Sequence, residues 1–210
     1  MTFYDLAAPV YGIWAAVLES RAHRLAGEAL ASYAGLDLLE VAVGTGIALS
    51  GLSAVSAFRR YVGVDLSMGM LKRTRRRLRS APMERTCLCQ ADAQALPFRA
   101  QAFDALLNSY MIDLLPESEI PIVLREFRRV LHSDGCLVLL VMAEQRPALQ
   151  RLWMALYRHA PLLVGWCRPV DAAKWLNGSG WELERQEEVS QRGFRSRLIV
   201  ARPHAPVTGG

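Results

Sequence analysis

Apolar residues recur along this 210-residue chain at two different spacings. Short apolar runs, typical of buried strands, alternate with longer segments in which apolar residues return every three or four positions, as in amphipathic helices. Strands separated by helices predict right-handed crossover connections and a parallel sheet. The pattern predicts strands at 37–43, 60–65, 84–90, 103–108 and 136–142, and helices at 46–57, 67–80 and 117–131.

Both ends of the chain depart from this alternation. Helical periodicity over residues 3–33 predicts a helical segment before the first strand, and residues 146–178 predict helices after the fifth strand. Two further apolar segments, 181–191 and 194–201, follow with only a predicted turn at Arg192-Gly193 between them. Consecutive strands without an intervening helix are expected to pair antiparallel.

The strand expected at 136–142 includes most of the longest purely apolar run, Leu137 to Ala143, and Asp134-Gly135 before it predicts a turn. Its seven residues are far fewer than the ~20 that span a bilayer. Near the N-terminus, Asp5 precedes any lysine or arginine and Pro9 interrupts the apolar residues, unlike a signal peptide. We therefore expect a cytoplasmic location.

The four cysteines form no Cys-x-x-Cys pair and have no companion histidines at zinc-binding spacing, so we expect no metal site. Cys87 and Cys89 alternate on a predicted strand, and both would face the same side. Hydrophobic residues make up 52% of the chain and charged residues 21%, as in globular proteins. We expect buried, reduced thiols.

The positive charge of the chain, net +5, is unevenly placed: six of the eight residues from Lys72 to Arg79 are basic. One interpretation is a solvated helix face. The other is attraction to an anionic surface, either lipid or nucleic acid. In the first interpretation four residues at helical spacing turn towards the core, Met70, Leu71, Thr74 and Leu78.

The stretch from Leu38 to Ala48 is an apolar strand that ends in a Gly-x-Gly turn and continues into a helical pattern. Twenty-one residues after Gly44, the second strand ends in Asp65. Glycines let the main chain approach a ligand, and an acidic residue ending the next strand can bind two ribose hydroxyls. This spacing predicts a nucleoside-containing cofactor. A dinucleotide such as NAD or FAD is disfavoured, because Leu49 replaces the third glycine of that motif.

Short motifs lie in or directly after each of the predicted strands. They are Leu39-Glu40-Val41-Ala42-Val43-Gly44-Thr45-Gly46, Val64-Asp65-Leu66-Ser67 with Met70-Leu71, Gln90-Ala91-Asp92-Ala93 with Leu96-Pro97-Phe98, Phe103 to Asn108, and Arg129-Val130-Leu131 with Gly135. Together they resemble class I S-adenosylmethionine-dependent methyltransferases over about residues 36–143. Ala42 departs from the family pattern, which usually has a glycine there.

This resemblance implies an α/β fold, a Rossmann-like three-layer sandwich with a seven-stranded mixed sheet in the order 3-2-1-4-5-7-6 and the last strand antiparallel. The length of the chain predicts one domain over residues 1–202, and the lack of core-forming residues after it predicts a disordered tail over 203–210. Within the domain, residues 1–35 would form an N-terminal helical lid. Residues 144–178 would form a helical insert that builds the acceptor pocket.

The resemblance also assigns residues to S-adenosylmethionine. Glu40 would hold the methionine ammonium group or orient the turn, and Asp65 would bind the ribose hydroxyls. Asp92 would bind the adenine amino group, with the amide of Ala93 facing a ring nitrogen. For both aspartates the alternative is helix N-capping. The full set is Glu40, Ala42, Gly44, Thr45, Gly46, Asp65, Leu66, Met70, Asp92, Ala93 and Asn108, with Leu66, Met70 and Leu96 packing against the base.

The methyl acceptor is harder to predict, because such an enzyme mainly aligns the reactants for SN2 displacement and excludes water. The Asn/Asp-Pro-Pro-Tyr/Phe tetrapeptide of amino-methylating nucleic-acid and protein enzymes is missing, and Asn108-Ser109-Tyr110-Met111 stands in its place. No Pro-Cys nucleophile of cytosine methylation is present either. We therefore expect no nucleic-acid partner and favour a small hydrophobic or lipid acceptor.

The opening segment, Phe3 to Tyr11, resembles that of ubiquinone/menaquinone-biosynthesis C-methyltransferases and related phospholipid N-methyltransferases. The acceptor would then be a quinone or aromatic carbon, or the head-group amine of a phospholipid. In that branch the segment folds over the cofactor, so Tyr4 and Tyr11 would be lid contacts, and Tyr11 is also a catalytic candidate. Simple packing is the alternative. The basic helix and the N-terminus favour contact with an anionic membrane at its inner face.

Residues beyond the fourth strand are candidates for acceptor chemistry. Asp113 stands where many relatives carry a polar residue facing the transferred methyl, so it could act as a general base, anchor a cationic amine, or merely cap the next helix. Tyr110, His159 and Arg168 are candidates for acceptor binding, Arg168 through a fork that suits acidic or phosphate groups. A non-catalytic cofactor-binding protein remains an alternative, supported only by Ala42.

Overall fold

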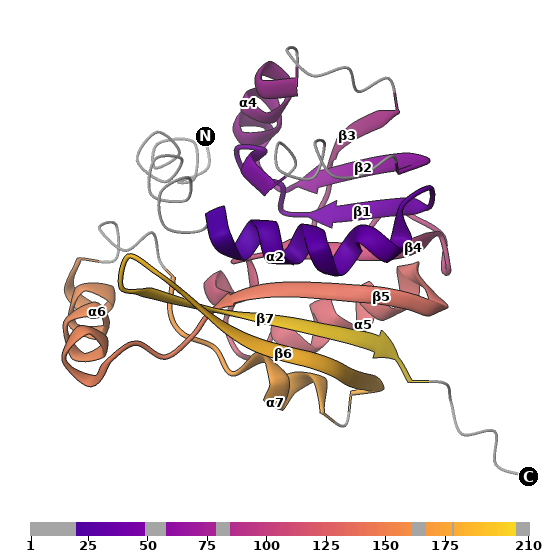
Figure 1. Cartoon of the computed structure of the whole chain (residues 1–210). Helices are drawn as coiled ribbons and strands as arrows, with labels where there is room; N and C mark the ends of the chain where they lie inside the picture. The colour runs from indigo at the N-terminus through magenta and orange to yellow at the C-terminus, as the bar shows by residue number, and fades with distance from the viewer. Residues whose placement is uncertain (1–19, 49–57, 79–84, 161–166, 178, 205–210) are drawn as a thin grey trace, which may run out of the picture.

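The computed structural model describes residues 20–48, 58–78, 85–160, 167–177 and 179–204 (Figure 1). Among these residues a seven-stranded sheet runs in the order β3-β2-β1-β4-β5-β7-β6, as predicted. The strands are β1 Asp37–Val41, β2 Arg60–Asp65, β3 Thr86–Gln90, β4 Phe103–Ser109, β5 Leu131–Met142, β6 Trp181–Gln191 and β7 Phe194–Pro203. The helices are α2 Ser20–Leu30, α4 Met68–Leu78, α5 Ile120–Val130, α6 Pro147–His159 and α7 Ala172–Leu176, with short 3-10 turns η1 Ala31–Tyr33 and η2 Ile112–Leu114.

The first five strands pair parallel, and β7 lies antiparallel between β5 and β6. The predicted turn between the last two strands is confirmed. Arg192 and Gly193 both adopt positive φ, 50° and 85°, which gives a two-residue hairpin the twist that its strands need. Because the first five strands are parallel, their carboxyl ends share one edge of the sheet, the edge where α/β proteins bind ligands.

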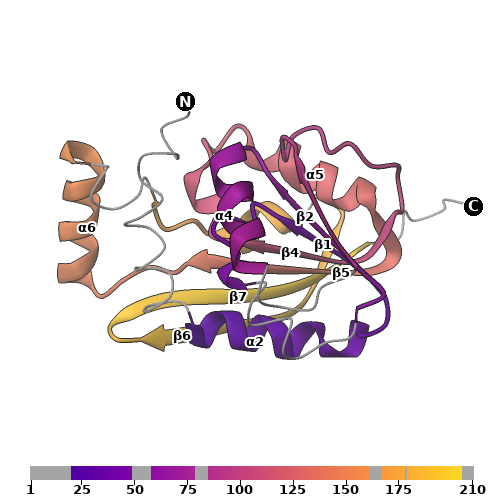
Figure 2. The ribbon, with the colours of Figure 1, turned by 90° about the horizontal axis from the view of Figure 1, so that it is seen from above.

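Helices cover both faces of the sheet and make three layers (Figure 2). Successive strand residues point to opposite faces, so Leu38 packs in the cluster under α2, and Leu39 in the cluster under α5. The α5 cluster includes the fully buried rings of Phe103 and Phe127. This burial on both faces explains the continuous apolar run in β5.

The turn predicted at Asp134-Gly135 is wrong, because β5 begins at Leu131 and runs through it. Phe103 pairs with Leu131, but Ala105 pairs with Cys136, so β5 carries extra residues against β4 and bulges. A Cβ on Gly135 would lie 3.0 Å from the carbonyl oxygens of Asp104 and His132, so the bulge needs a glycine.

The burial expected for the thiols of β3 is also wrong, since Cys87 is exposed and Cys89 only partly buried. β3 is the edge strand of the sheet, and its connection to β4, residues 91–102, contains no helix that could cover it. Cys136, in the central β5, is buried as expected, and all four cysteines are free.

The predicted helices are found where the structure describes them, with shorter bounds. The helix expected at 117–131 begins only at Ile120, and of the one expected at 46–57 the described residues 47–48 are helical. The predicted lid falls largely on residues 1–19, which lie outside the described residues. None of the helices that the structure describes is both long and apolar enough to cross a membrane.

Candidate cofactor and acceptor site

The turn after β1 has an unusual backbone. Ala42, Gly44 and Gly46 all adopt positive φ, at 60°, 54° and 75°. A Cβ on Gly46 would lie 2.9 Å from Cγ2 of Thr74, so the turn packs too closely on α4 for any side chain there. The Thr74 hydroxyl also donates a hydrogen bond of 2.8 Å to the Gly44 carbonyl. The turn is thereby held at the carboxyl edge of the sheet.

Asp65, the last residue of β2, fixes the other side of this turn. Its Oδ2 accepts a hydrogen bond from the Gly44 amide and its Oδ1 from the Ser67 amide, each at 2.8 Å. Burial raises the pKa of Asp65, and both amides oppose that shift. A carboxylate has about four acceptor positions, so two remain for ribose hydroxyls. The N-cap hydrogen bond of α4 is donated by the Met70 amide to Oγ of Ser67, so Asp65 itself is not the cap of this helix.

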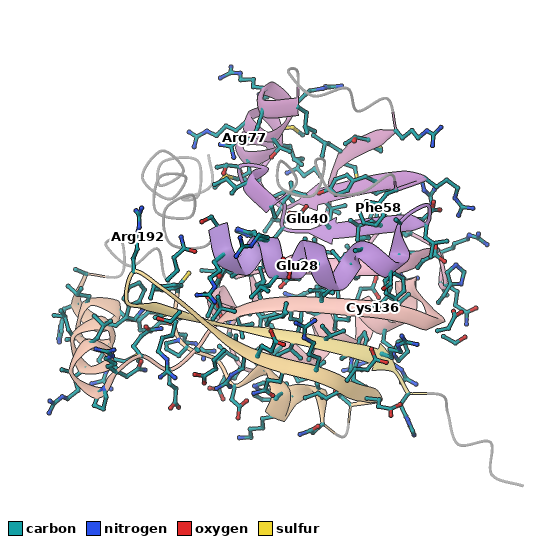
Figure 3. All side chains as sticks on the ribbon, viewed as in Figure 1. Glu28, Glu40, Phe58, Arg77, Cys136 and Arg192 are labelled. Carbon is teal, nitrogen blue, oxygen red and sulfur yellow. The ribbon has the colours of Figure 1, made fainter. Side chains whose placement is uncertain are left out.

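Glu40 lies at the carboxyl end of β1 and is buried (Figure 3). The Tyr61 hydroxyl donates a hydrogen bond to its Oε2. Burial raises the pKa of Glu40 to about 8, Asp65 nearby adds to the shift, and the Tyr61 hydrogen bond opposes it. Glu40 also lines a small cavity of about 50 Å³ together with Gly44, Thr45 and other residues around the turn.

Asn108, near the end of β4, links the carboxyl ends of two neighbouring strands. Its side-chain amide donates a hydrogen bond of 2.9 Å to the Val41 carbonyl. Its Oδ1 is buried and has no hydrogen-bond partner in the described part of the chain. A buried acceptor without a donor costs about 1–3 kcal/mol. A ligand that donates a hydrogen bond at this edge would remove that cost.

The loop after β3 presents the residues predicted for the base. Asp92 is exposed, and its Oδ1 accepts a hydrogen bond from the Gln94 amide in a turn, not at a helix start. Glu126 of α5 holds the loop by accepting a 2.7 Å hydrogen bond from the Leu96 amide. Of the three apolar residues predicted to pack the base, Leu66 is 56% exposed, whereas Met70 and Leu96 are buried in the core.

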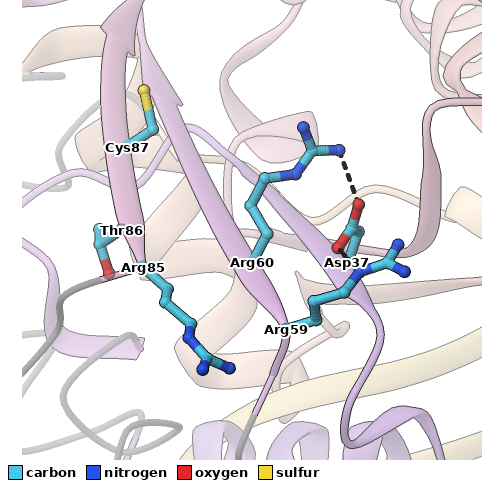
Figure 4. Close-up of a pocket in the computed structure, with 6 residues that line it drawn as sticks. All are labelled: Asp37, Arg59, Arg60, Arg85, Thr86 and Cys87. Carbon is cyan, nitrogen blue, oxygen red and sulfur yellow. Dashed lines mark hydrogen bonds and ion pairs between the residues drawn. The ribbon is translucent and has the colours of Figure 1, made fainter.

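A larger hollow of about 580 Å³ lies at the opposite edge of the sheet, at the amino ends of β2 and β3 (Figure 4). Arg59 and Arg60 both pair with Asp37 there, at 2.8 and 2.7 Å. Parallel sheets bind ligands at the carboxyl ends of their strands. The smaller cavity beside Glu40, rather than this hollow, therefore lies at the edge where such sheets bind ligands.

Asp113 lies in η2, just beyond β4, with its side chain fully buried. Its Oδ2 accepts a 2.8 Å hydrogen bond from the Met142 amide, and its Oδ1 has no hydrogen-bond partner among the described residues. Burial raises the pKa of Asp113 to about 8, against the opposing charge of Arg168. The helix-capping alternative is wrong, since α5 begins only at Ile120.

Arg168 joins the segment before α7 to η2. Its main-chain amide donates to the Asp113 carbonyl at 3.2 Å, and its guanidinium donates to the Leu115 carbonyl at 2.8 Å. Glu117 lies 3.7 Å from the guanidinium. The structure thus brings together Asp113 and Arg168, two residues predicted from distant parts of the sequence.

Comparison with known proteins identifies the family. The family model described as a methyltransferase domain matches residues 38–135. The ubiquinone/menaquinone biosynthesis C-methyltransferase of Syntrophotalea carbinolica is 31% identical, over 99% of this chain and 88% of that protein. The chain belongs to the class I S-adenosylmethionine-dependent methyltransferases. The NAD-binding alternative is thereby excluded, and the protein is an enzyme of methyl transfer.

Two further comparisons agree with this methyltransferase assignment. The demethylmenaquinone methyltransferase of Staphylococcus aureus is 27% identical over 84% of this chain and 73% of its own length. A chain from the complex between the Haloferax volcanii Trm112 methyltransferase activator and a methyltransferase superposes with a TM-score of 0.75. It is 15% identical and covers 98% of this chain and 99% of its own, which shows the shared fold.

The site of this methyltransferase fits S-adenosylmethionine on its own geometry. Glu40 offers a carboxylate for the ammonium group beside the turn, and Asp65 keeps free acceptor positions for the ribose. Leu66 leaves an apolar side chain exposed next to Asp65, where a base can stack. Asn108 has an unused buried acceptor near the same turn. These residues come from the ends of three neighbouring strands.

The remaining residues predicted to bind the acceptor differ in their positions in the structure. Tyr110 is buried, its hydroxyl hydrogen-bonds to Ser196 at 2.7 Å, and it lines the small cavity with Glu40. His159 is exposed at the end of α6, which stands beyond the end of the sheet (Figure 1). Tyr4 and Tyr11 lie outside the described residues.

Tyr61 is a functional candidate that the sequence did not indicate. It comes from the amino half of β2 and reaches Glu40 because Leu38 pairs with Tyr61 in the parallel register. Glu40 is two residues after Leu38 in β1, so its side chain lies on the same face of the sheet as the side chain of Leu38. Only the register between the two strands could have revealed this contact.

Proposed function

We propose that this methyltransferase methylates a small hydrophobic acceptor, with a ring carbon of a reduced quinone as the leading class. The observation that supports this is the extent of the similarity to the quinone-biosynthesis C-methyltransferase. It covers 99% of the chain and therefore includes residues 144–178, where we expect the acceptor pocket, as well as the cofactor motifs.

Asp113 is the base in this proposal. Bound S-adenosylmethionine supplies an electrophilic methyl group on a sulfonium, whose sulfur leaves with the bonding electron pair. Asp113 accepts the proton of the quinol hydroxyl next to the nucleophilic carbon and so raises the electron density of that carbon. After the carbon–methyl bond forms, the methylated carbon gives up its hydrogen as a proton, which leaves to water as the net proton of the reaction, and the ring regains its aromaticity. Asp113 returns its own proton to the ring oxygen.

The surroundings of Asp113 suit this role. Its buried Oδ1 has no described partner and so keeps an acceptor position for a substrate hydroxyl, while the Met142 amide fixes the orientation of the carboxyl group through Oδ2. Burial raises the pKa of Asp113 to about 8, so only its ionised form, which becomes more abundant as the pH rises towards 8, takes up the quinol proton. Arg168 lies close enough to moderate that shift.

The test uses a short-chain demethylated quinol, methyl-labelled S-adenosylmethionine and the purified protein. Wild-type protein should transfer label to the quinol. Asp113→Asn keeps an oxygen for the Met142 amide but cannot take a proton, so kcat should fall by about 10²-fold or more. Cofactor affinity should stay unchanged. Asp134→Asn, an exposed aspartate at the far edge of the sheet, is the matched control and should be fully active.

A kcat of Asp113→Asn equal to that of wild type would remove Asp113 as the base. Failure of the wild-type protein to label any quinol would reject the acceptor class itself.

The head-group amine of a phospholipid is the second candidate acceptor. The observation in its favour is the same unpartnered Oδ1, because an ionised carboxylate can also hold an ammonium group. The two acceptors differ in their products. Label in a methylated head group, released by phospholipase treatment, would favour the lipid, and label that stays with the quinol ring would favour the quinone.

A further inference from the structure

Helix α6 stands apart from the layered body of the protein. It begins five residues after β5 ends at Met142 and lies beyond the carboxyl edge of the sheet in both views (Figures 1 and 2). None of its residues is buried. An amphipathic helix of a globular protein normally buries its apolar stripe against the core. The apolar side chains of α6 therefore need another explanation.

The side of α6 that faces the protein is fixed by specific contacts. Gln150 accepts a 2.9 Å hydrogen bond from the Gln145 amide. The indole of Trp153 donates a 2.9 Å hydrogen bond to the Cys167 carbonyl and packs against Phe194, with ring centres 6.0 Å apart. These contacts hold one face of the helix towards the β6–β7 hairpin and turn the opposite face to solvent.

Two leucines of α6 are exposed, Leu152 on the outward face and Leu149 at its border, on the side of Trp153 four residues away. Leu149 is 37% exposed and Leu152 58% exposed, and residues three apart lie side by side on a helix. Among the described residues, the other large exposed apolar side chains are single residues on other elements, Leu36, Leu66, Met68 and Ile122. The exposed leucine pair on α6 favours a site of interaction there.

The charge around these leucines has one sign. Arg151 and Arg158 are exposed on α6, and the helix contains no acidic residue. Arg192 is exposed at the tip of the β6–β7 hairpin, on the same side of the molecule (Figure 3). Leucines beside arginines on a helix that itself contains no acid match the chemistry of a bilayer whose surface carries phosphate groups, although Glu144 is exposed three residues before the helix.

We propose that α6 is a membrane-docking helix that lies in the interface of an anionic phospholipid bilayer. Leu149 and Leu152 enter the acyl boundary, and Arg151, Arg158 and Arg192 contact the lipid phosphates. Docking by α6 turns the carboxyl edge of the sheet towards the membrane. A hydrophobic acceptor can then reach Asp113 with little exposure to water, a consequence that rests on the proposed function.

The other basic helix, α4, suits this role less well. Arg75 and Arg76 are exposed on it, but Met70 and Leu71 are buried against the sheet. Apart from Met68 at its first residue, α4 has no large exposed apolar side chain, so most of its solvent face can only attract lipid by charge. Arg75 and Arg76 of α4 therefore provide a control pair with the same charge as Arg151 and Arg158 of α6.

The experiment is sedimentation of the full-length protein with vesicles of phosphatidylcholine and phosphatidylglycerol, and with phosphatidylcholine alone. Wild type should bind the anionic vesicles at least tenfold more tightly. Leu149→Gln/Leu152→Gln should lower that affinity at least tenfold without changing net charge, and Ile122→Gln on α5, a residue 40% exposed, should not change it. Arg151→Ala/Arg158→Ala should weaken binding tenfold, and Arg75→Ala/Arg76→Ala by less than twofold.

Several results would overturn docking by α6: no binding of wild type, wild-type affinity of the leucine variant, or equal losses in both arginine variants. Thermal melts confirm that each variant is folded. Vesicle binding needs no methyl acceptor, so docking stands or falls separately from the proposed function. If wild type binds vesicles but methylates no quinol, only the proposed function fails.

Discussion

The Tyr61 hydroxyl donates a hydrogen bond to Oε2 of Glu40, inside the protein and beside the glycine turn. Without a cofactor, burial keeps the pKa of Glu40 at about 8, so the carboxyl group is mostly protonated at neutral pH. An ammonium group bound next to it would favour the ionised form. The cofactor and the proton on Glu40 therefore compete.

This competition predicts how cofactor affinity depends on pH. Below the pKa of Glu40, binding of S-adenosylhomocysteine releases a proton, so affinity should rise by up to about tenfold per pH unit between pH 6 and 8. Tyr61→Phe removes the hydrogen bond that favours the ionised form and should move this rise to higher pH. Calorimetry in buffers of different ionisation enthalpy measures both affinity and proton release. Affinity that is flat from pH 6 to 8 would contradict the role of Glu40.

The same two buried acids predict how stability depends on pH. The pKa values of Glu40 and Asp113 are raised in the folded state, to about 8 in both cases. Between their unfolded values near 4 and the folded values, the folded state binds more protons than the unfolded state. Stability of the cofactor-free protein should therefore fall as pH rises from about 5 to 8.

Thermal melting over that pH range is the measurement. Glu40→Gln and Asp113→Asn should each flatten the profile, and Asp134→Asn should leave it unchanged because Asp134 is exposed. A melting temperature that increases steadily towards pH 8 would show that these acids ionise normally.

Replacing Ala42 with glycine should increase the stability of the protein, because Ala42 has a positive φ. Its φ of 60° costs an alanine about 1–2 kcal/mol, whereas glycine adopts it readily. Ala42→Gly should stabilise the protein by about 1 kcal/mol, or roughly 2–4 °C in melting temperature. Ala34→Gly is the control, because Ala34 has a φ of −57° and gains nothing from glycine. Equal melting temperatures for Ala42→Gly and wild type would mean that the turn is not strained.

Removal of the Asp65 carboxylate should weaken cofactor binding. Asp65→Ala removes the acceptor for the Gly44 and Ser67 amides and for the ribose, so affinity for S-adenosylhomocysteine should fall at least a hundredfold. Asp37→Ala is the matched control, an aspartate at the other end of the neighbouring strand that pairs only with residues of the far edge. It should lower thermal stability and leave cofactor affinity intact. Wild-type affinity of Asp65→Ala would remove the ribose assignment.

The alternation of strands and helices predicted the parallel strands and the final antiparallel pair, and the family resemblance supplied the sheet order. The sequence prediction failed at Asp134-Gly135, where a pair that usually forms a turn instead sits in a bulge whose existence depends on pairing with β4. It failed at Cys87, because alternation along a strand does not reveal that the strand lies at an edge without a covering helix.

The strand ends that carry the motif residues could be predicted from the sequence, and the resemblance assigned those residues to the cofactor. The Tyr61–Glu40 contact could not, since it depends on the register between two strands. The proximity of Asp113 and Arg168 could not either, because 55 residues separate them in the chain. Burial of Glu40 and Asp113, which sets their acidity, is a property of packing alone.

Methyl transfer into a hydrophobic acceptor is tested most directly with methyl-labelled S-adenosylmethionine and an extract of the source cells. After incubation with the protein, label is counted in the organic-soluble, small polar and macromolecular fractions. The account predicts label in the organic-soluble fraction, abolished by Asp65→Ala and strongly reduced by Asp113→Asn. Label confined to the polar or macromolecular fraction would contradict it.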